Sequence, residues 1–158
     1  MQANPMPRDT TGTPDGRRAV MALCAEAKPA ELEAALAVVG YRGGVADLRA
    51  PEVGLVMARA RIGGDGRRFN LGEATVTRAT VRLDGGETGF AYQLGRDKAR
   101  ARAAAVLDAL WQSPSHCAAV EAALACVARR VEAERALDAR RAAATRVEFF
   151  TLVRGEDA

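Results

Sequence analysis

The chain has 158 residues, 49% of them hydrophobic and 27% charged, which suits one globular domain. Its formal net charge of +3 is too small to require a nucleic-acid partner, although it tolerates an anionic ligand. Three cysteines without a Cys-x-x-Cys motif argue against a disulfide framework and favour a reducing compartment. Because we find neither a signal peptide nor an apolar run of roughly 20 residues, we expect a cytoplasmic protein outside the membrane.

Residues 1–12 are expected to form a disordered extension of a single α+β domain that spans residues 13–158. Thr13-Pro14-Asp15 is typical of a helix start, since Thr can cap and Pro is favoured in the first turn. We expect this helix to reach Ala27 and a second helix to run from Pro29 to Gly40, each with one apolar face.

From Gly43 the apolar residues alternate, which is typical of strands. The pattern predicts an antiparallel meander of three or four strands, packed with the N-terminal and C-terminal helices. The expected strands are Val45–Leu48, Gly54–Ile62, Phe69–Leu83 and Thr88–Leu94, with turns at Ala50-Pro51-Glu52, at Gly63–Gly66 and at Asp84–Gly86.

Two more helices are expected after the strands, one capped by Asp97 and one starting at Ser113-Pro114. The second carries an apolar stripe that stops at Val131, so its far end should be solvated or lie on a partner. The tail, residues 146–155, is unexpectedly apolar. No linker divides the chain into two domains.

A complete catalytic set is not found in this sequence. His116 is the only histidine, so it is the only base that could activate a serine or cysteine nucleophile. Ser113 and Ser115 beside it fit better as capping residues, and Cys117 is only a weak indication of a metal site. We therefore predict neither catalytic residues nor a metal site in this chain.

The most distinctive polar feature is basic. Arg78 and Arg82 lie four residues apart on one expected strand and so share a face, while Arg96 and Lys98 flank the expected start of a helix. Together these four residues could hold a phosphate or a phosphonate. The alternative, which we weight more heavily, is that Asp97 already caps the helix and the arginines pair with acidic residues of this chain or of a partner.

Four stretches of the sequence resemble the PhnG family, a subunit family of the bacterial carbon–phosphorus lyase system. The longest is Gly63-Gly-Asp-Gly-Arg-Arg-Phe-Asn-Leu-Gly-Glu-Ala-Thr-Val-Thr-Arg-Ala-Thr-Val-Arg-Leu83. The others are Pro29-Ala-Glu-Leu32, then Leu94-Gly-Arg-Asp-Lys98 leading into Leu107-Asp-Ala-Leu110, and Arg146-Val-Glu-Phe-Phe-Thr-Leu-Val-Arg-Gly155. The stretches follow the family's order along the chain, whereas the region from Cys117 to Ala144 matches only in helical character.

This resemblance implies a non-autonomous subunit that works with PhnH, PhnI and PhnJ subunits in the use of organic phosphonates. The implied reaction converts MgATP and an alkylphosphonate to ribose 1-phosphonate 5-triphosphate and releases adenine, as in ribose 1-methylphosphonate 5-triphosphate synthase. MgATP would be a co-substrate of the assembly, and we expect no cofactor bound by this chain alone.

The resemblance also bears on individual residues. It makes the apolar tail a candidate interface, in which aromatic side chains anchor a partner; the expected contact residues are Phe149, Phe150, Leu152 and Arg154. Arg78, Arg82, Arg96 and Lys98 become candidates either for contacts to the triphosphate or phosphonate or for ion pairs to another subunit. Self-association through the tail is a further possibility.

Two other functions compete with this one. A small basic nucleic-acid-binding α+β module would stack bases on exposed aromatic residues, but Phe90 and Tyr92 have no aromatic neighbour on an adjacent expected strand. A stand-alone hydrolase lacks a catalytic set. We therefore expect partners of protein rather than nucleic acid.

Overall fold

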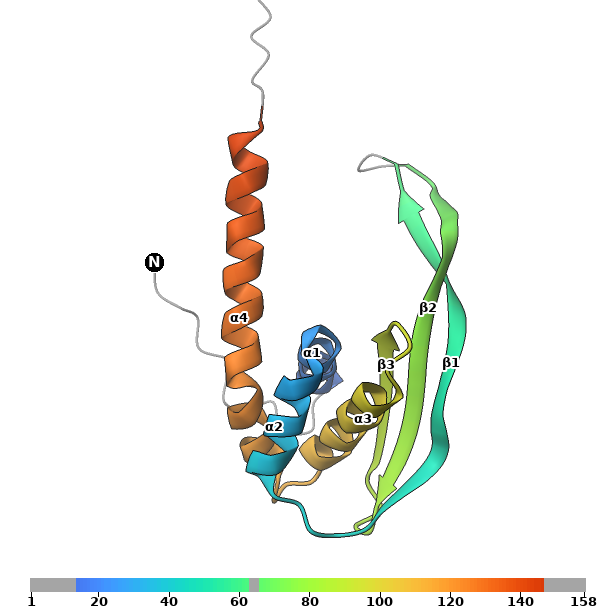
Figure 1. Ribbon diagram of the computed structural model, residues 1–158, viewed down its shortest axis with the longest axis vertical. Coiled ribbons are helices and arrows are strands. Elements are labelled where there is room, and N and C mark those ends of the chain that lie inside the picture. The colour runs from blue at the N-terminus through green and yellow to red at the C-terminus, as the bar shows by residue number, and fades with distance from the viewer. Residues whose placement is uncertain (1–13, 63–65, 147–158) are drawn as a thin grey trace, which may run out of the picture.

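The computed structural model describes residues 14–62 and 66–146 (Figure 1). The described residues form four helices and three strands, and the predicted α+β class is confirmed. In chain order they are α1 (Pro14–Glu26), α2 (Pro29–Val39), β1 (Val45–Arg61), β2 (Arg68–Leu83), β3 (Thr88–Leu94), α3 (Lys98–Gln112) and α4 (Cys117–Ala144).

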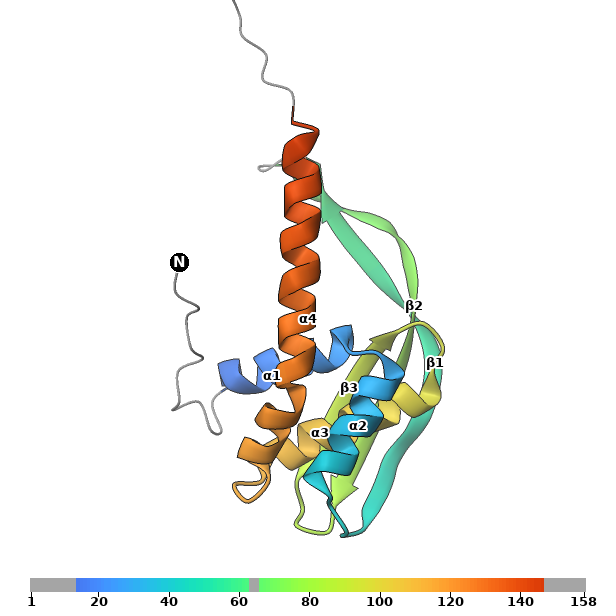
Figure 2. The same ribbon diagram turned by 60° about the vertical axis from the view of Figure 1, so that its left-hand side comes forward.

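The sheet is antiparallel, with strand order β1-β2-β3. The helices gather on one side of it, with α3 nearest, and leave the other face open (Figures 1 and 2). Alternation explains this arrangement, because Thr77, Ala79 and Val81 of β2 are buried while Arg82 is exposed.

The core lies between the sheet and the helices and is built mostly of alanine, valine and leucine. The predicted apolar stripes form it. Val20 and Cys24 of α1, Leu32 of α2 and Val120, Leu124, Val127 and Val131 of α4 are all buried. Trp111 of α3 is the largest fully buried side chain, and its Nε1 donates to Glu121 Oε1 at 3.0 Å.

The end of α2 and the start of α3 are close to expectation. The second helix ends at Val39, and Gly40 follows with φ 63°, in the left-handed region that glycine adopts without a Cβ penalty. Helix α3 is capped as predicted, since the Asp97 side chain accepts from the Arg100 N–H at 2.9 Å.

Two local predictions are wrong. The turn expected at Ala50-Pro51-Glu52 is not a turn, because β1 runs through it and absorbs it in register shifts between Asp47 and Glu52. Proline is tolerated there because β1 is an edge strand with no neighbour on its other side in the described chain. The last helix begins at Cys117 rather than Ser113, since Ser113 ends α3 by donating its N–H to Leu110 O.

Two elements project beyond the core in the same direction: the distal half of α4 and the distal half of the β1–β2 hairpin (Figures 1 and 2). Every described residue of α4 after Val131 is exposed, as its sequence predicted. Among the residues described, no helix has the length and apolar character needed to span a membrane.

Candidate functional site

The open face of the sheet carries both aromatic and cationic side chains. On it, Arg78 lies opposite Tyr92, Thr80 opposite Phe90, and Arg82 opposite Thr88. Phe90, Tyr92 and Leu94 are 42%, 56% and 71% exposed. Among the described residues, the helices lie on the other face and reach this one only at its β3 edge, where Arg17 of α1 lies over the Phe90 ring. The rest of this surface is open to a ligand or a partner.

Arg78 is already paired within the chain. Its Nε donates to Glu52 Oε1 at 2.6 Å, and Arg49 Nη1 donates to the same oxygen at 3.2 Å. The hydrogen bond with Glu52 raises the pKa of Arg78, and Tyr92 contributes in the same direction. An anion that approaches Arg78 must therefore compete with the Glu52 carboxylate.

The four predicted cations do not form one cluster. Arg82 lies four residues from Arg78, about 13 Å along the strand. Arg82 lies opposite the first residue of β3, whereas Arg96 and Lys98 follow its last residue, at the other end of the seven-residue strand. In the described part of the chain Arg82, Arg96 and Lys98 are exposed and make no ion pair.

Asp97 limits what the start of α3 can bind, because its carboxylate already occupies that helix terminus. Arg78 and Arg82 therefore belong to one candidate anion-binding surface, on the sheet, and Arg96 and Lys98 belong to another, at the start of α3. The predicted interface residues Phe149, Phe150, Leu152 and Arg154 lie outside the described residues.

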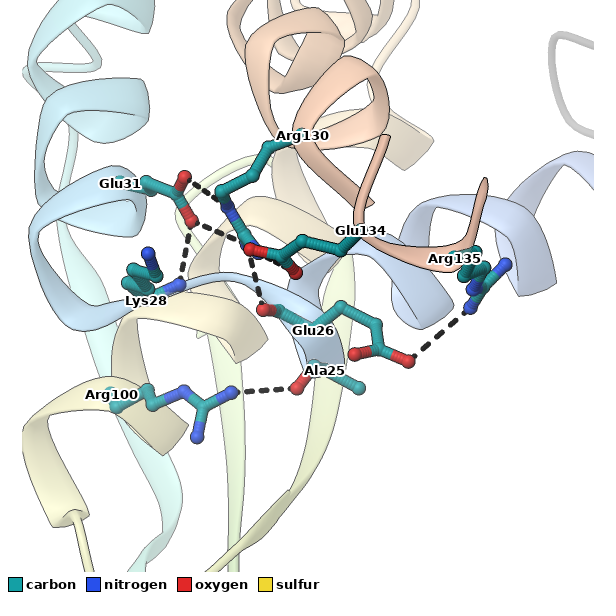
Figure 3. A network of polar contacts seen from close by, with 8 residues as sticks. All are labelled: Ala25, Glu26, Lys28, Glu31, Arg100, Arg130, Glu134 and Arg135. Carbon is teal, nitrogen blue, oxygen red and sulfur yellow. Dashed lines mark hydrogen bonds and ion pairs between the residues drawn. The ribbon is translucent and has the colours of Figure 1, made fainter. Parts of the chain in front are cut away.

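A polar network that the sequence did not indicate fixes the helices to one another at the end of α1 (Figure 3). Three successive carbonyl oxygens there accept side-chain hydrogen bonds from three different elements. Gln93 Nε2 of β3 donates to Cys24 O at 3.0 Å, Arg100 Nη2 of α3 to Ala25 O at 2.6 Å, and Arg130 Nη2 of α4 to Glu26 O at 3.0 Å. The end of a helix leaves such carbonyls without partners, so each bond satisfies one of them.

Arg130 is the centre of this network. It donates to both oxygens of Glu31, through Nε at 2.7 Å and Nη2 at 2.9 Å, and to Glu134 through Nη1 at 2.8 Å. The same carboxylate of Glu31 accepts the Lys28 N–H at 2.7 Å, at the start of α2. Glu31 was not identified from the sequence as a member of such a pair. Its partner is 99 residues away, so no local pattern could identify Arg130.

A second ion pair, with a buried carboxylate, joins α1 to α3. Asp108, whose side chain is 2% exposed, accepts from Arg17 Nε at 2.9 Å, from Arg17 Nη2 at 2.7 Å and from the Phe90 N–H at 2.8 Å. Arg17 also lies over the Phe90 ring, 5.6 Å from its centroid. The hydrogen bond to Asp108 raises the pKa of Arg17, against the opposing effect of burial. This pair borders an open groove of about 700 Å³ lined by Pro14, Arg17, Arg18, Met21, Phe90, Trp111 and Gln112.

The residues around His116 do not assemble into a nucleophile–base pair of the usual kind. Ser115 Oγ lies 2.9 Å from His116 Nδ1, but among the described residues no carboxylate is hydrogen-bonded to the ring to orient it. His116 stands at the N-cap position of α4 without a side-chain cap hydrogen bond, and its ring meets Tyr41 edge to face. Among residues 14–62 and 66–146, no three His, Cys, Asp or Glu side chains come close enough to share a metal ion.

Comparison with known proteins identifies the family. The family model for the phosphonate metabolism protein PhnG matches residues 15–155. The chain is also 56% identical over 141 residues to the alpha-D-ribose 1-methylphosphonate 5-triphosphate synthase subunit PhnG of Rhizobium meliloti (strain 1021). That match covers 89% of this chain and 90% of the relative. The resemblance inferred from the sequence is thereby confirmed, and the chain belongs to the PhnG family of phosphonate metabolism proteins.

Proposed function

We propose that this chain is the PhnG subunit of an alpha-D-ribose 1-methylphosphonate 5-triphosphate synthase and takes part in phosphonate use only as a member of that assembly. The observation that carries the proposal is the 56% identity over nine tenths of both chains to a relative of that name. Because the match covers nearly the whole of both chains, the two proteins share their full domain and not merely one motif.

The site geometry supports a subunit role. The chain's only histidine stands at a helix start, and the ion pairs of Arg17 with Asp108 and of Arg130 with Glu31 each join two helices, while the Arg17 pair also borders the open groove. By contrast, the open sheet face and the projecting hairpin and helix offer large surfaces to other proteins (Figure 1). We infer that the chain contributes surfaces, and that the reacting groups lie mainly on other subunits.

The partners we propose are PhnH-, PhnI- and PhnJ-type subunits. The proposed substrates are MgATP and an alkylphosphonate, from which the assembly forms a ribose 1-phosphonate 5-triphosphate and releases adenine. Because MgATP is a cytoplasmic substrate, the proposed place of action is the cytoplasm. The tail residues Phe149, Phe150, Leu152 and Arg154 remain predicted interface residues.

Reconstitution tests this function directly. This chain, PhnH- and PhnI-type subunits from the same source are co-expressed, and adenine release from MgATP and methylphosphonate is measured. We expect release with all three subunits and none when this chain is omitted. Equal release without this chain would overturn the proposal.

Arg78 can be tested in the same assembly. If it contacts the phosphonate or the triphosphate, Arg78→Ala should leave the complex intact on size exclusion and abolish most adenine release. Glu52→Gln is the matched control, because it removes the carboxylate that pairs with Arg78 but keeps the guanidinium. If Arg78→Ala instead prevents assembly while Glu52→Gln does not, Arg78 pairs with another subunit.

A further inference from the structure

The distal part of the β1–β2 hairpin is a two-stranded ribbon that the rest of the chain does not cover. Strand β3 ends opposite Val76, so the residues of β2 before Val76 pair with β1, and only Thr75 has a further backbone contact, since its carbonyl accepts the Gly95 N–H at 2.9 Å. We call residues 53–62 and 66–75 the arm. Both views show it extending past β3 and α3 (Figures 1 and 2).

The arm is apolar on both faces and exposed on both. None of its described residues is buried. Leu55 and Met57 point to one side of β1, at 61% and 50% exposed, and Val56 points to the other, at 39% exposed. The remaining large apolar residues that are exposed on the arm are Val53, Ile62, Phe69 and Leu71.

Such a ribbon is marginal by itself, because a two-stranded hairpin in water has little apolar surface to bury. An exposed apolar patch of this kind marks a surface that meets another protein. Since both faces of the arm are apolar, a partner with a flat surface would cover one face and leave the other in water. A partner with a groove would cover both faces, so a groove fits the arm better.

The charges of the arm indicate what lines that groove. Four arginines, Arg59, Arg61, Arg67 and Arg68, gather toward its tip, and Arg61 lies directly opposite Arg68. Like charges directly across a strand pair are destabilising. No arginine of this group has a carboxylate partner in the described chain.

We propose that the arm inserts into an apolar groove on another subunit of the synthase, and that carboxylates at the end of that groove pair with the tip arginines. This inference rests on the proposed function. A second copy of this chain fits less well, because pairing two arms would bring two arginine clusters together. A nucleic acid fits less well too, because it would leave the apolar faces in water.

Paired variants of the full chain, co-expressed with the other synthase subunits, test the arm. Arg61→Glu with Arg68→Glu replaces two of the four positive charges of the tip arginines by negative ones, so that their sum falls from +4 to 0. Arg42→Glu with Arg129→Glu makes the same change of net charge at exposed positions away from the arm. We expect the tip variant to weaken binding to the partner subunits by roughly tenfold or more, and the control variant to bind as the wild type does.

A second variant separates the apolar contribution from the charged one. Leu55→Ser with Met57→Ser removes apolar surface from exposed positions, so the isolated chain should keep its circular dichroism spectrum and its Tm. Binding to the partner subunits should still fall. For the wild type, the affinity should decrease as salt rises, and the tip variant should lose most of that salt dependence.

The outcomes are distinct. If the wild type binds none of these subunits, the proposed function fails and the partner assigned to the arm fails with it. If the wild type binds and both arm variants bind equally well, only the arm proposal is overturned. Light scattering that shows an arm-dependent dimer of the isolated chain, or arm-dependent binding to duplex DNA at about 0.15 M salt, would assign the arm to a different occupant and overturn the proposal.

Discussion

Arg130 of α4 and Glu31 of α2 form a two-pronged ion pair, with Nε 2.7 Å from Oε1 and Nη2 2.9 Å from Oε2. A guanidinium matches a carboxylate in this geometry better than an ammonium group does. The pair fixes the middle of α4 against the α1–α2 junction. The direction in which the free half of α4 projects therefore depends on it.

This pair should make stability depend on pH. The hydrogen bond from Arg130 lowers the pKa of Glu31 below its usual value of 4.5. A lowered carboxyl pKa contributes stability that is present above the usual value and is lost as the pH falls through the lower folded value. We therefore expect Glu31→Gln to be less stable than the wild type near neutral pH, by about 1 kcal/mol or less. The difference should shrink below the usual value of 4.5.

Calorimetric Tm measurements at about pH 7 and about pH 3.5 check this dependence. Glu33→Gln is the matched control, since Glu33 lies on the same helix, is exposed and makes no ion pair within the described chain. A Tm difference between Glu31→Gln and wild type that is the same at both pH values would contradict the prediction.

Loss of the buried Asp108 carboxylate should lower the free energy of unfolding more than loss of the Glu31 carboxylate does. Asp108→Ala leaves Arg17 unpaired and the Phe90 N–H without its acceptor, so we expect a loss of about 2–4 kcal/mol in the free energy of unfolding. Urea unfolding measures it. Asp138→Ala removes an exposed carboxylate 3.7 Å from Arg141 and should cost within about 0.5 kcal/mol. Similar costs for the two variants would show that the Arg17–Asp108 pair is not a major contact.

Two leucines of α4 should respond differently to the same substitution. Leu124 is fully buried, whereas Leu137 is 46% exposed on the projecting half of the helix. Leu124→Ala should destabilise the isolated chain by about 2–5 kcal/mol, because it leaves a cavity. Leu137→Ala should change stability by about 0.5 kcal/mol or less. A large loss for Leu137→Ala in the isolated chain would mean that the distal helix is packed in solution.

Cysteine reactivity should separate the three thiols. Burial raises the pKa of the Cys24 thiol to about 12, and the nearby Asp108 charge adds to the effect. Burial also raises the pKa of Cys117, with Glu121 contributing. Cys126 is exposed. Since the thiolate is the reactive form, a disulfide reagent should modify one thiol quickly in the native chain and all three after denaturation.

The control is Cys126→Ser, which should abolish the fast phase. Two fast thiols in the native wild type would show that the core opens around Cys24 or Cys117.

Local patterns in the sequence predicted much of the fold. The stripe of Val120, Leu124, Val127 and Val131 identified the buried face of α4, because a helix repeats every 3.6 residues. Alternation along residues 69–83 located β2. The turn at Ala50-Pro51-Glu52 was wrongly predicted because a proline next to acidic and small residues is typical of a turn. Only the position of β1 at the sheet edge makes that proline acceptable within a strand, and a local pattern does not reveal strand order.

The contacts between distant residues could not be predicted in this way. The sequence singled out Arg78, but its partner Glu52 had been assigned to the wrongly predicted turn. Arg17 and Asp108 are 91 residues apart, and nothing in the sequence near either one indicates the other. Side-chain pairing of this kind depends on the assembled fold.

Pro51 has a consequence for the chain before it binds a partner. Pro51 and the register shifts between Asp47 and Glu52 prevent another strand from pairing with the first part of β1. The stretch from Val53 to Ala58 has neither a charge nor a proline, so it lacks this protection. Chains that have not yet bound a partner can therefore associate with one another through edge-to-edge strand pairing at that stretch. A partner subunit that holds the arm, as proposed above, would cover that stretch and so limit such self-association.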